Sequence, residues 1–491
     1  MEQLHLYNSL SRRKELFEPL NPPFVGLYLC GPTVYSDPHL GNARSAVNFD
    51  ILYRYLLHLG YRVRYVRNIT DVGHLEGDAD EGEDKIGKKA RLEQVEPMEI
   101  AQRYADRYLD MLDQLNVLRP SIVPRATGHI PEQIALVESI LAAGYAYVAG
   151  GSVYFDVPKY ARDYPYGALS GRTLDEMLAV TRELEGTTEK RHPADFALWK
   201  RAAPEHLMRW QSPWGEGFPG WHLECTVMST KYLGNPFDVH GGGMDLKFPH
   251  HEAEMAQTNA CCPPGAPTHQ ARYWLHNNMV TLNGAKMTKS LGNTLSTWEI
   301  YAGSSPLLTK AYSPMATRFF ILQAHYRSTL DFTDAGLAAA EKGLGRLMGA
   351  LAKLPTLTAG ATSSLDVAAW ERDLYGALND DLNTAVALAE LFKAAGWVHA
   401  VASGEESLDG EALAALHETY RVVLVDVLGL KPELDGQTHA QLDATLGLLV
   451  ELRLEARKAK NWALSDRIRD ELKAAGIQLN DGPQGTSWVV E

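Results

Sequence analysis

The stretch Phe24–Cys30, FVGLYLC, is a short and nearly continuous apolar run that ends at Gly31-Pro32. A run of this length before a turn signal predicts a buried strand. Residues 47–59 then place apolar side chains at helical spacing, and Gly60 is a typical helix end. Residues 61–66 alternate and predict a second strand. Strand, helix and strand in this order predict a parallel sheet with a right-handed crossover.

Strand patterns return further along the chain at 237–240, before three glycines, and at 273–276. A helix is expected to begin near Pro249. After about residue 316 the pattern is almost wholly helical, with periodic segments at 334–354, 366–402, 411–428 and 439–475, before a short tail at 476–491. The expected fold is α/β: a Rossmann-like parallel-sheet catalytic domain with an insertion, followed by all-α C-terminal domains.

Composition narrows the class of protein. The chain has 491 residues, enough for about three domains. We find no apolar run of about 18 residues and no apolar signal core near the N-terminus, so we expect no membrane contact and a cytoplasmic location. Four cysteines in a chain of this length do not indicate a disulfide framework. A net charge of −14 weakens a nucleic-acid assignment but leaves room for a local basic patch.

A candidate phosphate site lies where the first strand turns into the first long helix, at His39-Leu40-Gly41-Asn42. Backbone N–H groups and the helix dipole attract anions there. Gly41 allows close approach of a nucleotide, and His39 can donate to a phosphate. Taken alone, the tetrapeptide is equally compatible with an ordinary loop histidine beside a helix start.

A second basic motif, Lys286-Met287-Thr288-Lys289-Ser290, lies between Gly284 and Gly292. Its two ammonium groups suit pyrophosphate, although alone it resembles a basic surface loop. The order of the two motifs in one α/β domain favours a shared ATP site that activates a small carboxylic acid. Because a carboxylate is already a charged nucleophile, this reaction needs positioning and charge stabilisation rather than a general base. Mg²⁺ is expected with ATP.

Metal-ligating residue types also occur, but their spacing alone is weak evidence. Cys30 precedes the phosphate turn, Cys225 follows Trp221-His222-Leu223-Glu224, and His250 and Glu254 would share one helical face. Two thiolates, an imidazole and a carboxylate make a plausible zinc set. His251 or Glu252 could replace His250 or Glu254, and a lone buried cysteine is more often a core residue.

The two phosphate motifs resemble the HIGH and KMSKS signatures of class I aminoacyl-tRNA synthetases, with departures at Leu40, Asn42 and Thr288. Of these, Asn42 removes a second histidine. Further stretches resemble the cysteinyl-tRNA synthetase family, and the resemblance runs over nearly the whole chain. They are residues 29–35, 67–71, 221–225, 240–246 and 248–254.

This resemblance implies roles for individual residues. Zinc would be bound by Cys30, Cys225, His250 and Glu254, and it would select the substrate thiol over the serine hydroxyl. Because four protein ligands already close a tetrahedral site, the substrate sulfur is expected to make zinc five-coordinate or to loosen Glu254. Gly31, Thr70 and Trp221 would surround the substrate. The ATP-binding set would be His39, Gly41, Asn42, His240, Asp245, Lys286 and Lys289, with His39, Lys286 and Lys289 catalytic.

The function that the resemblance implies is ATP-dependent formation of cysteinyl-adenylate from L-cysteine and transfer of cysteine to the 3′ end of tRNA(Cys). The alternative is the cysteine–amino-sugar ligase of mycothiol synthesis, which lacks the roughly 150 residues after 340. A zinc hydrolase would lack a general-base motif here, and a non-catalytic RNA-binding relative would not need the lysine loop.

The domains expected on this basis divide the chain into five parts. They are 1–120 with 211–300 (Rossmann-like catalytic domain with the zinc site), 121–210 (connective insertion), 301–350 (stem-contact region including the end of the catalytic loop), 351–430 (helical bundle) and 431–491 (small anticodon-recognition domain). Within the last part, residues 451–474 carry seven basic and five acidic side chains. Trp462 and Trp488 could stack on unpaired bases, although either could be a core residue.

Overall fold

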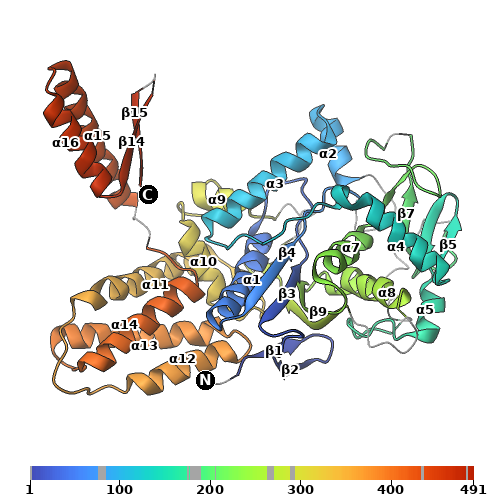
Figure 1. Cartoon of the computed structure of the whole chain (residues 1–491), viewed down its shortest axis with the longest axis horizontal. Coiled ribbons are helices and arrows are strands. Elements are labelled where there is room, and N and C mark those ends of the chain that lie inside the picture. Colours follow the sequence, from blue (N-terminus) through green and yellow to red (C-terminus); the bar gives the residue numbers. More distant parts are fainter. Residues whose placement is uncertain are drawn as a thin grey trace. The chain divides into compact units, whose positions relative to one another are not determined.

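A computed structural model gives the architecture of the chain (Figure 1). Two compact units are present, Met1–Lys431 and Pro432–Glu491, and each is described by itself. The residues that the structure describes are 3–75, 84–173, 176, 189–204, 206–262, 270–287, 293–432, 436–482 and 485–490.

A four-stranded parallel sheet forms the centre of the first unit. Its strands are β3 (Phe24–Leu29), β4 (Arg62–Arg67), β9 (Phe237–Gly243) and β10 (Ala271–Asn277), in the order β10-β9-β3-β4. Helix α1 (Leu40–His58) connects β3 to β4, as the sequence predicts. The Rossmann-like α/β class is therefore confirmed, and the carboxyl ends of all four strands meet at one edge.

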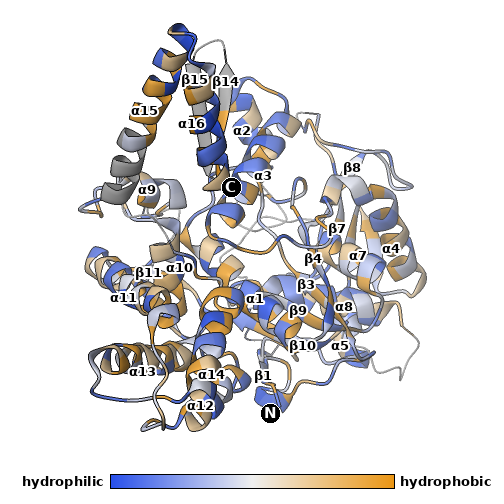
Figure 2. Ribbon diagram, turned by 60° about the vertical axis from the view of Figure 1, so that its left-hand side comes forward, coloured by the Kyte–Doolittle hydropathy of each residue, from blue (hydrophilic) through white to orange (hydrophobic). Residues whose placement is uncertain are grey.

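Helix α1 is buried on more than one face. It contacts β4 and β9 of the sheet and also helix α10 (Pro314–Leu322). Leu40, Val47 and Leu52 are fully buried. Figure 2 shows the hydropathy of the residues in this part of the fold. Because the helix is packed against both the sheet and α10, its N-terminal turn is held at the sheet edge.

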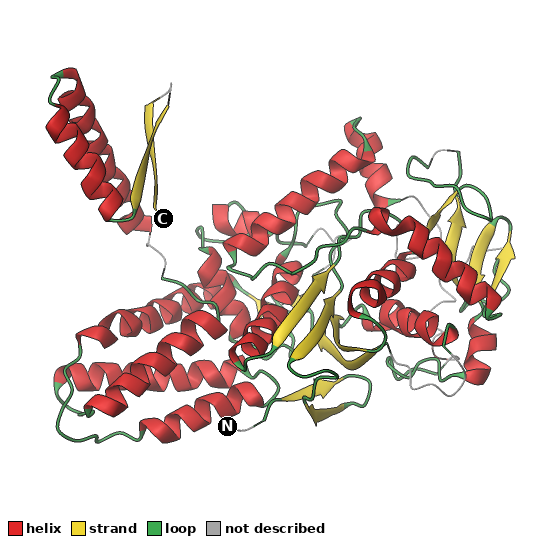
Figure 3. Ribbon diagram, in the orientation of Figure 1, coloured by secondary structure: helices red, strands yellow, loops and turns green. Residues whose placement is uncertain are grey.

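An antiparallel sheet lies between the two halves of the parallel sheet in sequence. Its strands, in order, are β5 (Ala146–Ala149), β6 (Ser152–Phe155), β7 (Phe196–Arg201) and β8 (Gly217–Pro219). Helix α4 (Ile130–Ala142) contacts β5 and β8. Directly after β8 the chain enters helix α7 (Trp221–Leu233), which returns it to the parallel sheet (Figure 3).

A small three-stranded sheet carries the first lysine of the second motif. It contains β11 (Val280–Leu282), β12 (Ala285–Lys286) and β13 (Leu330–Phe332), in the order β12-β11-β13. The first unit also contains further strands and helices outside these sheets. They are β1 (His5–Asn8), β2 (Arg13–Leu16), α2 (Lys85–Glu93), α3 (Pro97–Gln114), α5 (Val157–Asp163), α8 (Glu252–Ala260) and α9 (Thr297–Ala302).

The periodic segments after residue 316 form helices, and in the first unit the segment 366–402 is divided into two. The segment 366–402 becomes α12 (Val367–Asn379) and α13 (Thr384–Ser403), separated by Asp381 and Leu382 in left-handed backbone conformation. The neighbouring helices are α11 (Asp334–Lys353) and α14 (Gly410–Arg421). Among the helices in the described residues, α13 alone is long and apolar enough to pass a composition test for a membrane span. Core helices pass the same test, and α13 contacts α11, α12 and α14.

The second unit contains two helices and a hairpin. The periodic segment 439–475 is divided into α15 (Gly436–Lys458) and α16 (Trp462–Ala474), with Lys460 in left-handed conformation between them. The tail forms strands β14 (Ile477–Gly482) and β15 (Gly485–Val490), which pair antiparallel. Sequence patterns predicted no strands here. Trp462 is 57% exposed, whereas the side chain of Trp488 lies outside the described residues.

Candidate active site

The candidate metal ligands come from four separate segments that meet behind the carboxyl edge of the parallel sheet. Cys30 directly follows β3, and Cys225 lies in the second turn of α7. His250 lies in the turn before α8 and Glu254 in its first turn. Helix α8 begins at Glu252, a few residues after the expected start at Pro249. All four side chains are buried.

The donor atoms of these residues lie within 4.8 Å of one another. The two sulfurs, Cys30 Sγ and Cys225 Sγ, are 3.5 Å apart. His250 Nε2 lies 3.4 Å from Cys225 Sγ and 3.2 Å from Glu254 Oε1. Cys30 Sγ is 3.7 Å from the same oxygen. Four donors therefore converge on one point.

The chemistry of this donor set fits zinc. Two sulfurs, an imidazole and one carboxylate match the ligands of tetrahedral zinc sites. The imidazole is also oriented from behind, because His250 Nδ1 lies 3.0 Å from Nδ1 of His222. Without a cation, burial and nearby carboxylates raise the pKa of Cys30 to about 12. Deprotonated sulfur at this point therefore requires a positive charge.

A second group overlaps the first. Within the described part of the chain, Cys30, His240, His251 and Glu254 also bring donor atoms within 4.8 Å of one another. His251 Nε2 lies 3.3 Å from Cys30 Sγ, but its Nδ1 faces His276 Nε2 at 2.8 Å. This set offers one sulfur rather than two, so the first set suits zinc better.

Glu252, the other alternative from the sequence, belongs to neither group. Its carboxylate accepts hydrogen bonds from the backbone N–H groups of Gly167 at 2.9 Å and Ser170 at 2.8 Å. It therefore fixes a loop after α5 rather than facing the cysteines.

Gly31 and Thr70 lie beside this cluster. The Gly31 N–H donates to Asn68 Oδ1 at 2.8 Å, and a Cβ on Gly31 would lie 1.6 Å from the Asn68 carbonyl oxygen. Only glycine fits there. The Thr70 hydroxyl donates to Glu224, and burial raises the pKa of that carboxyl well above its usual range.

Trp221 is held between two imidazoles. Its ring stacks on His74 with centroids 4.1 Å apart and planes 10° from parallel. The His250 ring lies 4.6 Å away and tilted by 33°. Sequence reasoning missed His74 and His222 as ring partners of Trp221. The contact with His74 joins residues far apart in the chain and leaves no local pattern. For His222, its position next to Trp221 was the available signal.

The two phosphate motifs lie together. His39 caps α1: its Nδ1 accepts from the Asn42 N–H at 3.3 Å, while Asn42 Oδ1 accepts from the His39 N–H at 3.0 Å. A Cβ on Gly41 would lie 3.3 Å from the methyl carbon of Met287. The Leu40 N–H donates to Leu295 O at 3.0 Å. Lys286 is exposed, and Thr288, Lys289 and Ser290 lie outside the described residues.

The two remaining predicted ATP residues have different surroundings. His240 is fully buried, with Nε2 2.9 Å from Glu254 Oε2 and its ring stacked on Trp274 at 4.4 Å. Asp245 is exposed, after the end of β9. The structure thus brings His240 to the metal ligands, while Asp245 lies at the open edge.

Comparison with known proteins identifies the family of the chain. Residues 16–342 match the tRNA synthetases class I (C) catalytic domain, and residues 374–431 match the DALR domain. The cysteine–tRNA ligase of Bacteroides fragilis is 57% identical over 489 residues, covering 99% of each chain. That of Porphyromonas gingivalis is 57% identical over 487 residues, again covering 99% of each chain.

Solved structures show the same fold at low sequence identity. Methionyl-tRNA synthetase of Mycobacterium tuberculosis, in complex with methionyl-adenylate, has a TM-score of 0.60 at 14% identity, covering 84% of this chain and 93% of that one. Agrobacterium radiobacter K84 agnB2 LeuRS, in a ternary complex with tRNA and LeuAMS, has a TM-score of 0.59 at 12% identity, covering 86% of each. The chain belongs to the cysteine–tRNA ligases, which are class I aminoacyl-tRNA synthetases.

Proposed function

We propose that this ligase selects L-cysteine through a zinc ion held by Cys30, Cys225, His250 and Glu254. The observation that carries the proposal is the convergence of these four buried donors directly after β3. Packing alone separates side chains that differ by one small group by only about 1–3 kcal/mol. When bound, zinc would supply a bond that a thiolate makes far better than a hydroxyl.

The protein's own residues would shape the remainder of the cysteine pocket. Gly31 and Thr70 border the cluster, and Trp221, fixed between His74 and His250, would close one side. His222 and His240 would orient the ligands His250 and Glu254 from behind. A zinc ion held by buried and fixed donors would favour cysteine over serine, because a substrate that lacks the thiol cannot form the bond to the metal.

For activation, we propose that His39 and the N-terminal turn of α1 receive the phosphates of ATP. Gly41 and Asn42 would allow and shape this approach, and Lys286 and Lys289 would neutralise pyrophosphate. Mg²⁺ would accompany ATP. The substrate carboxylate attacks the α-phosphorus directly, so His39 and the lysines act by stabilising charge. Asp245 would contact the adenylate at the open edge, whereas the buried His240 would act through Glu254.

The second substrate would be tRNA(Cys), with the protein in the cytoplasm, where its free thiols stay reduced. The cysteine–amino-sugar ligase is not favoured, because the similarity to cysteine–tRNA ligases covers the whole chain. Contacts with the acceptor stem would come from 301–350 and the anticodon contacts from 431–491, with 121–210 as connective insertion and 351–430 as helical bundle. In the last domain, the exposed Trp462 is available to stack on a base.

Pyrophosphate exchange tests the proposal. Zinc-replete protein should exchange pyrophosphate into ATP with cysteine, and serine should support less than about a hundredth of that rate. Zinc X-ray absorption should change when cysteine is added, because the substrate sulfur would enter the coordination shell. Equal rates with cysteine and serine would falsify zinc-based selection. An absorption spectrum unaffected by cysteine would contradict direct contact between the thiol and the metal.

A further inference from the structure

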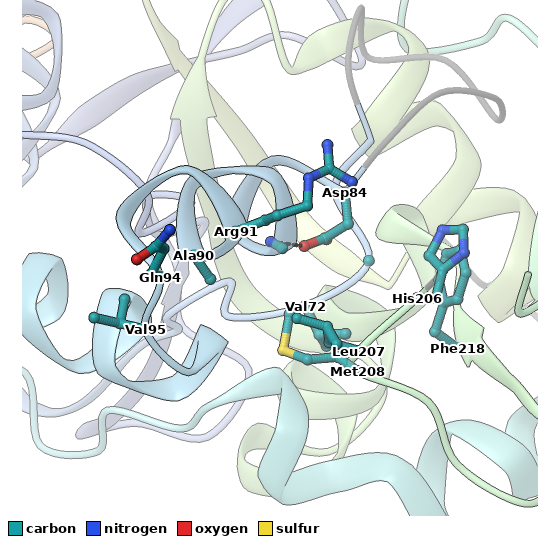
Figure 4. Close-up of a pocket in the computed structure, with 12 residues that line it drawn as sticks. Val72, Asp84, Ala90, Arg91, Gln94, Val95, His206, Leu207, Met208 and Phe218 are labelled. Carbon is teal, nitrogen blue, oxygen red and sulfur yellow. Dashed lines mark hydrogen bonds between the residues drawn. The ribbon is translucent and has the colours of Figure 1, made fainter. Parts of the chain in front are cut away.

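A cavity of about 620 Å³ lies between helix α2 and the segment 206–208, close to strand β8 (Figure 4). None of the residues discussed above as metal, cysteine or ATP ligands lines it. Val72 and Gly73 form its inner wall, and Ala90 and Arg91 line it from α2. Its volume exceeds that of one nucleoside, so it can admit a ligand of that size.

The cavity adjoins the cysteine side of the active site. Val72 and Gly73 follow Thr70 after the carboxyl end of β4, and a Cβ on Gly73 would lie 2.4 Å from the carbonyl oxygen of Pro219, two residues before Trp221. Since the sheet order is β10-β9-β3-β4, β4 is an edge strand. The adenylate side follows β9, across β3 from it. An occupant of the cavity would therefore approach the activated cysteine from the side opposite to ATP.

An aromatic pair and a hydrogen-bond donor line the cavity. The rings of His206 and Phe218 stack with centroids 4.9 Å apart and planes 26° from parallel. His206 Nδ1 accepts from the Ala203 N–H at 3.2 Å, so Nε2 carries the ring proton. That nitrogen is buried and has no hydrogen-bond partner among the residues the structure describes. The wall thus offers a flat surface and one N–H to a planar heterocycle.

Helix α2 forms the opposite wall, where Arg91 lines the cavity together with Asp84, the residue that caps the helix. Helix α2 carries Lys85, Lys88, Lys89 and Arg91 against a single acid, Glu93. The chain as a whole has a net charge of −14, so this helix is a local exception. The lysines lie on the helix outside the cavity lining, so the Arg91 guanidinium is the cation beside the aromatic pair, and it suits a nucleotide phosphate.

We propose that this cavity seats the 3′-terminal adenosine of the tRNA during transfer, a proposal that rests on the cysteine pocket assigned above. The base would lie against His206 and Phe218, with the last phosphates along α2. A ribose hydroxyl oxygen would then bond to the carbonyl carbon of cysteinyl-adenylate as the bond from that carbon to the phosphate oxygen breaks. AMP leaves with the electron pair, and the hydroxyl proton passes to a phosphate oxygen of AMP or to water.

The two half-reactions separate this site from the cysteine pocket. Leu207 lines the cavity and is 60% exposed, so Leu207→Trp should fold and partly fill it. We expect kcat/KM for tRNA charging to fall about tenfold or more, with ATP–pyrophosphate exchange unchanged. The matched control is Leu92→Trp, at a 71% exposed position on α2 that does not line the cavity. Charging should be unchanged in this control.

Unchanged charging in Leu207→Trp, or an equal fall in exchange and charging, would overturn the proposal. Absence of cysteine-dependent exchange in the unmodified enzyme would instead overturn the cysteine pocket itself. Fluorescence supplies a second readout, with full-length tRNA whose terminal adenosine is replaced by 2-aminopurine. Binding should quench the probe in the unmodified enzyme and in His206→Phe, which keeps the stack, but much less in His206→Leu. Equal quenching in all three proteins would contradict stacking on His206.

Discussion

The proposed active site has a thiol end and a phosphate end, and the structure holds the two in different ways. At the thiol end, Cys30, Cys225, His250 and Glu254 are at most 8% exposed and converge from four segments. At the phosphate end, Lys286 is exposed on a two-residue strand, and His39 is half-buried at a helix start. One end is built into the core, and the other faces the solvent.

This difference follows from what each end has to do. A buried donor set loses its hydration, so each of its polar atoms needs a fixed partner. A substrate that does not fit this set therefore binds at a large cost in free energy. In the proposed function the phosphate end would admit ATP and release pyrophosphate, which the exposed side chain of Lys286 permits. Substitutions at the thiol end should therefore remove metal and stability together. Substitutions at the phosphate end should lower the rate while leaving the fold intact.

The largest expected effect is that of Cys225→Ala. Loss of one sulfur opens the donor set, so tightly bound zinc should disappear and cysteine-dependent exchange should fall by at least about a hundredfold. The thermal midpoint should fall too, since metal binding stabilises the folded state. Zinc content by atomic emission, exchange assays and calorimetry measure these effects.

Cys261→Ala is the control for that variant. Cys261 is an exposed thiol outside both groups of candidate ligands, so zinc content and exchange should stay at the unmodified level. Full zinc occupancy in Cys225→Ala would show that the second set, with His240 and His251, holds the ion instead.

At the phosphate end, Lys286→Ala should lower kcat for exchange by about a hundredfold, because the ammonium group that would stabilise the developing pyrophosphate is lost. The thermal midpoint and zinc content should not change, since the side chain is exposed. Lys310→Ala removes an exposed lysine that pairs with Glu341 and serves as the control. A fall in zinc content or thermal midpoint in Lys286→Ala would contradict the prediction that the phosphate end affects the rate alone.

Gly31→Ala tests how tightly the thiol end is packed. The new Cβ would meet the Asn68 carbonyl oxygen at 1.6 Å, so β3 or the segment after β4 must shift. We expect a loss of about 1–3 kcal/mol in the free energy of unfolding and a higher KM for cysteine. Gly26→Ala in the same strand meets Leu233 and Phe237 at ordinary contact distances of 3.5 Å or more and should be milder. Denaturant unfolding and exchange kinetics compare the two. Equal effects would mean that the space around Gly31 is not critical.

The central fold could be predicted from the sequence, because local apolar patterns indicate β3, α1 and β4, and Gly60 indicates the end of α1. The division between α12 and α13 is not visible, because Asp381 and Leu382 adopt left-handed conformations that usually favour glycine. Long-range contacts hold that turn: Asp381 accepts from the Tyr7 N–H at 2.8 Å and from Arg327 Nε at 2.6 Å. Such partners cannot be recognised from residues nearby in the chain.

The same distinction applies to the site. His39, Gly41 and Lys286 belong to short motifs, so their position could be predicted from local sequence. Cys30, Cys225, His250 and Glu254 show no metal-binding spacing, and only the family resemblance singles them out. The supporting residue His74 meets Trp221 only through the packing of α7 against its neighbours, which no local pattern records.

The smallest expected effect is at Asn42, where the phosphate end depends on a helix cap. Asn42→Ala removes the oxygen that accepts the His39 N–H, so the free energy of unfolding should fall by about 1 kcal/mol and the KM for ATP should rise a few-fold. Asn42→Asp keeps an acceptor at the same atom, which should preserve the cap and the stability. Its negative charge beside the phosphates should still raise the KM for ATP. Denaturant unfolding and ATP titration of the exchange rate separate these effects. If Asn42→Asp bound ATP as well as the unmodified enzyme, the side chain would serve α1 alone and the phosphates would lie further from it.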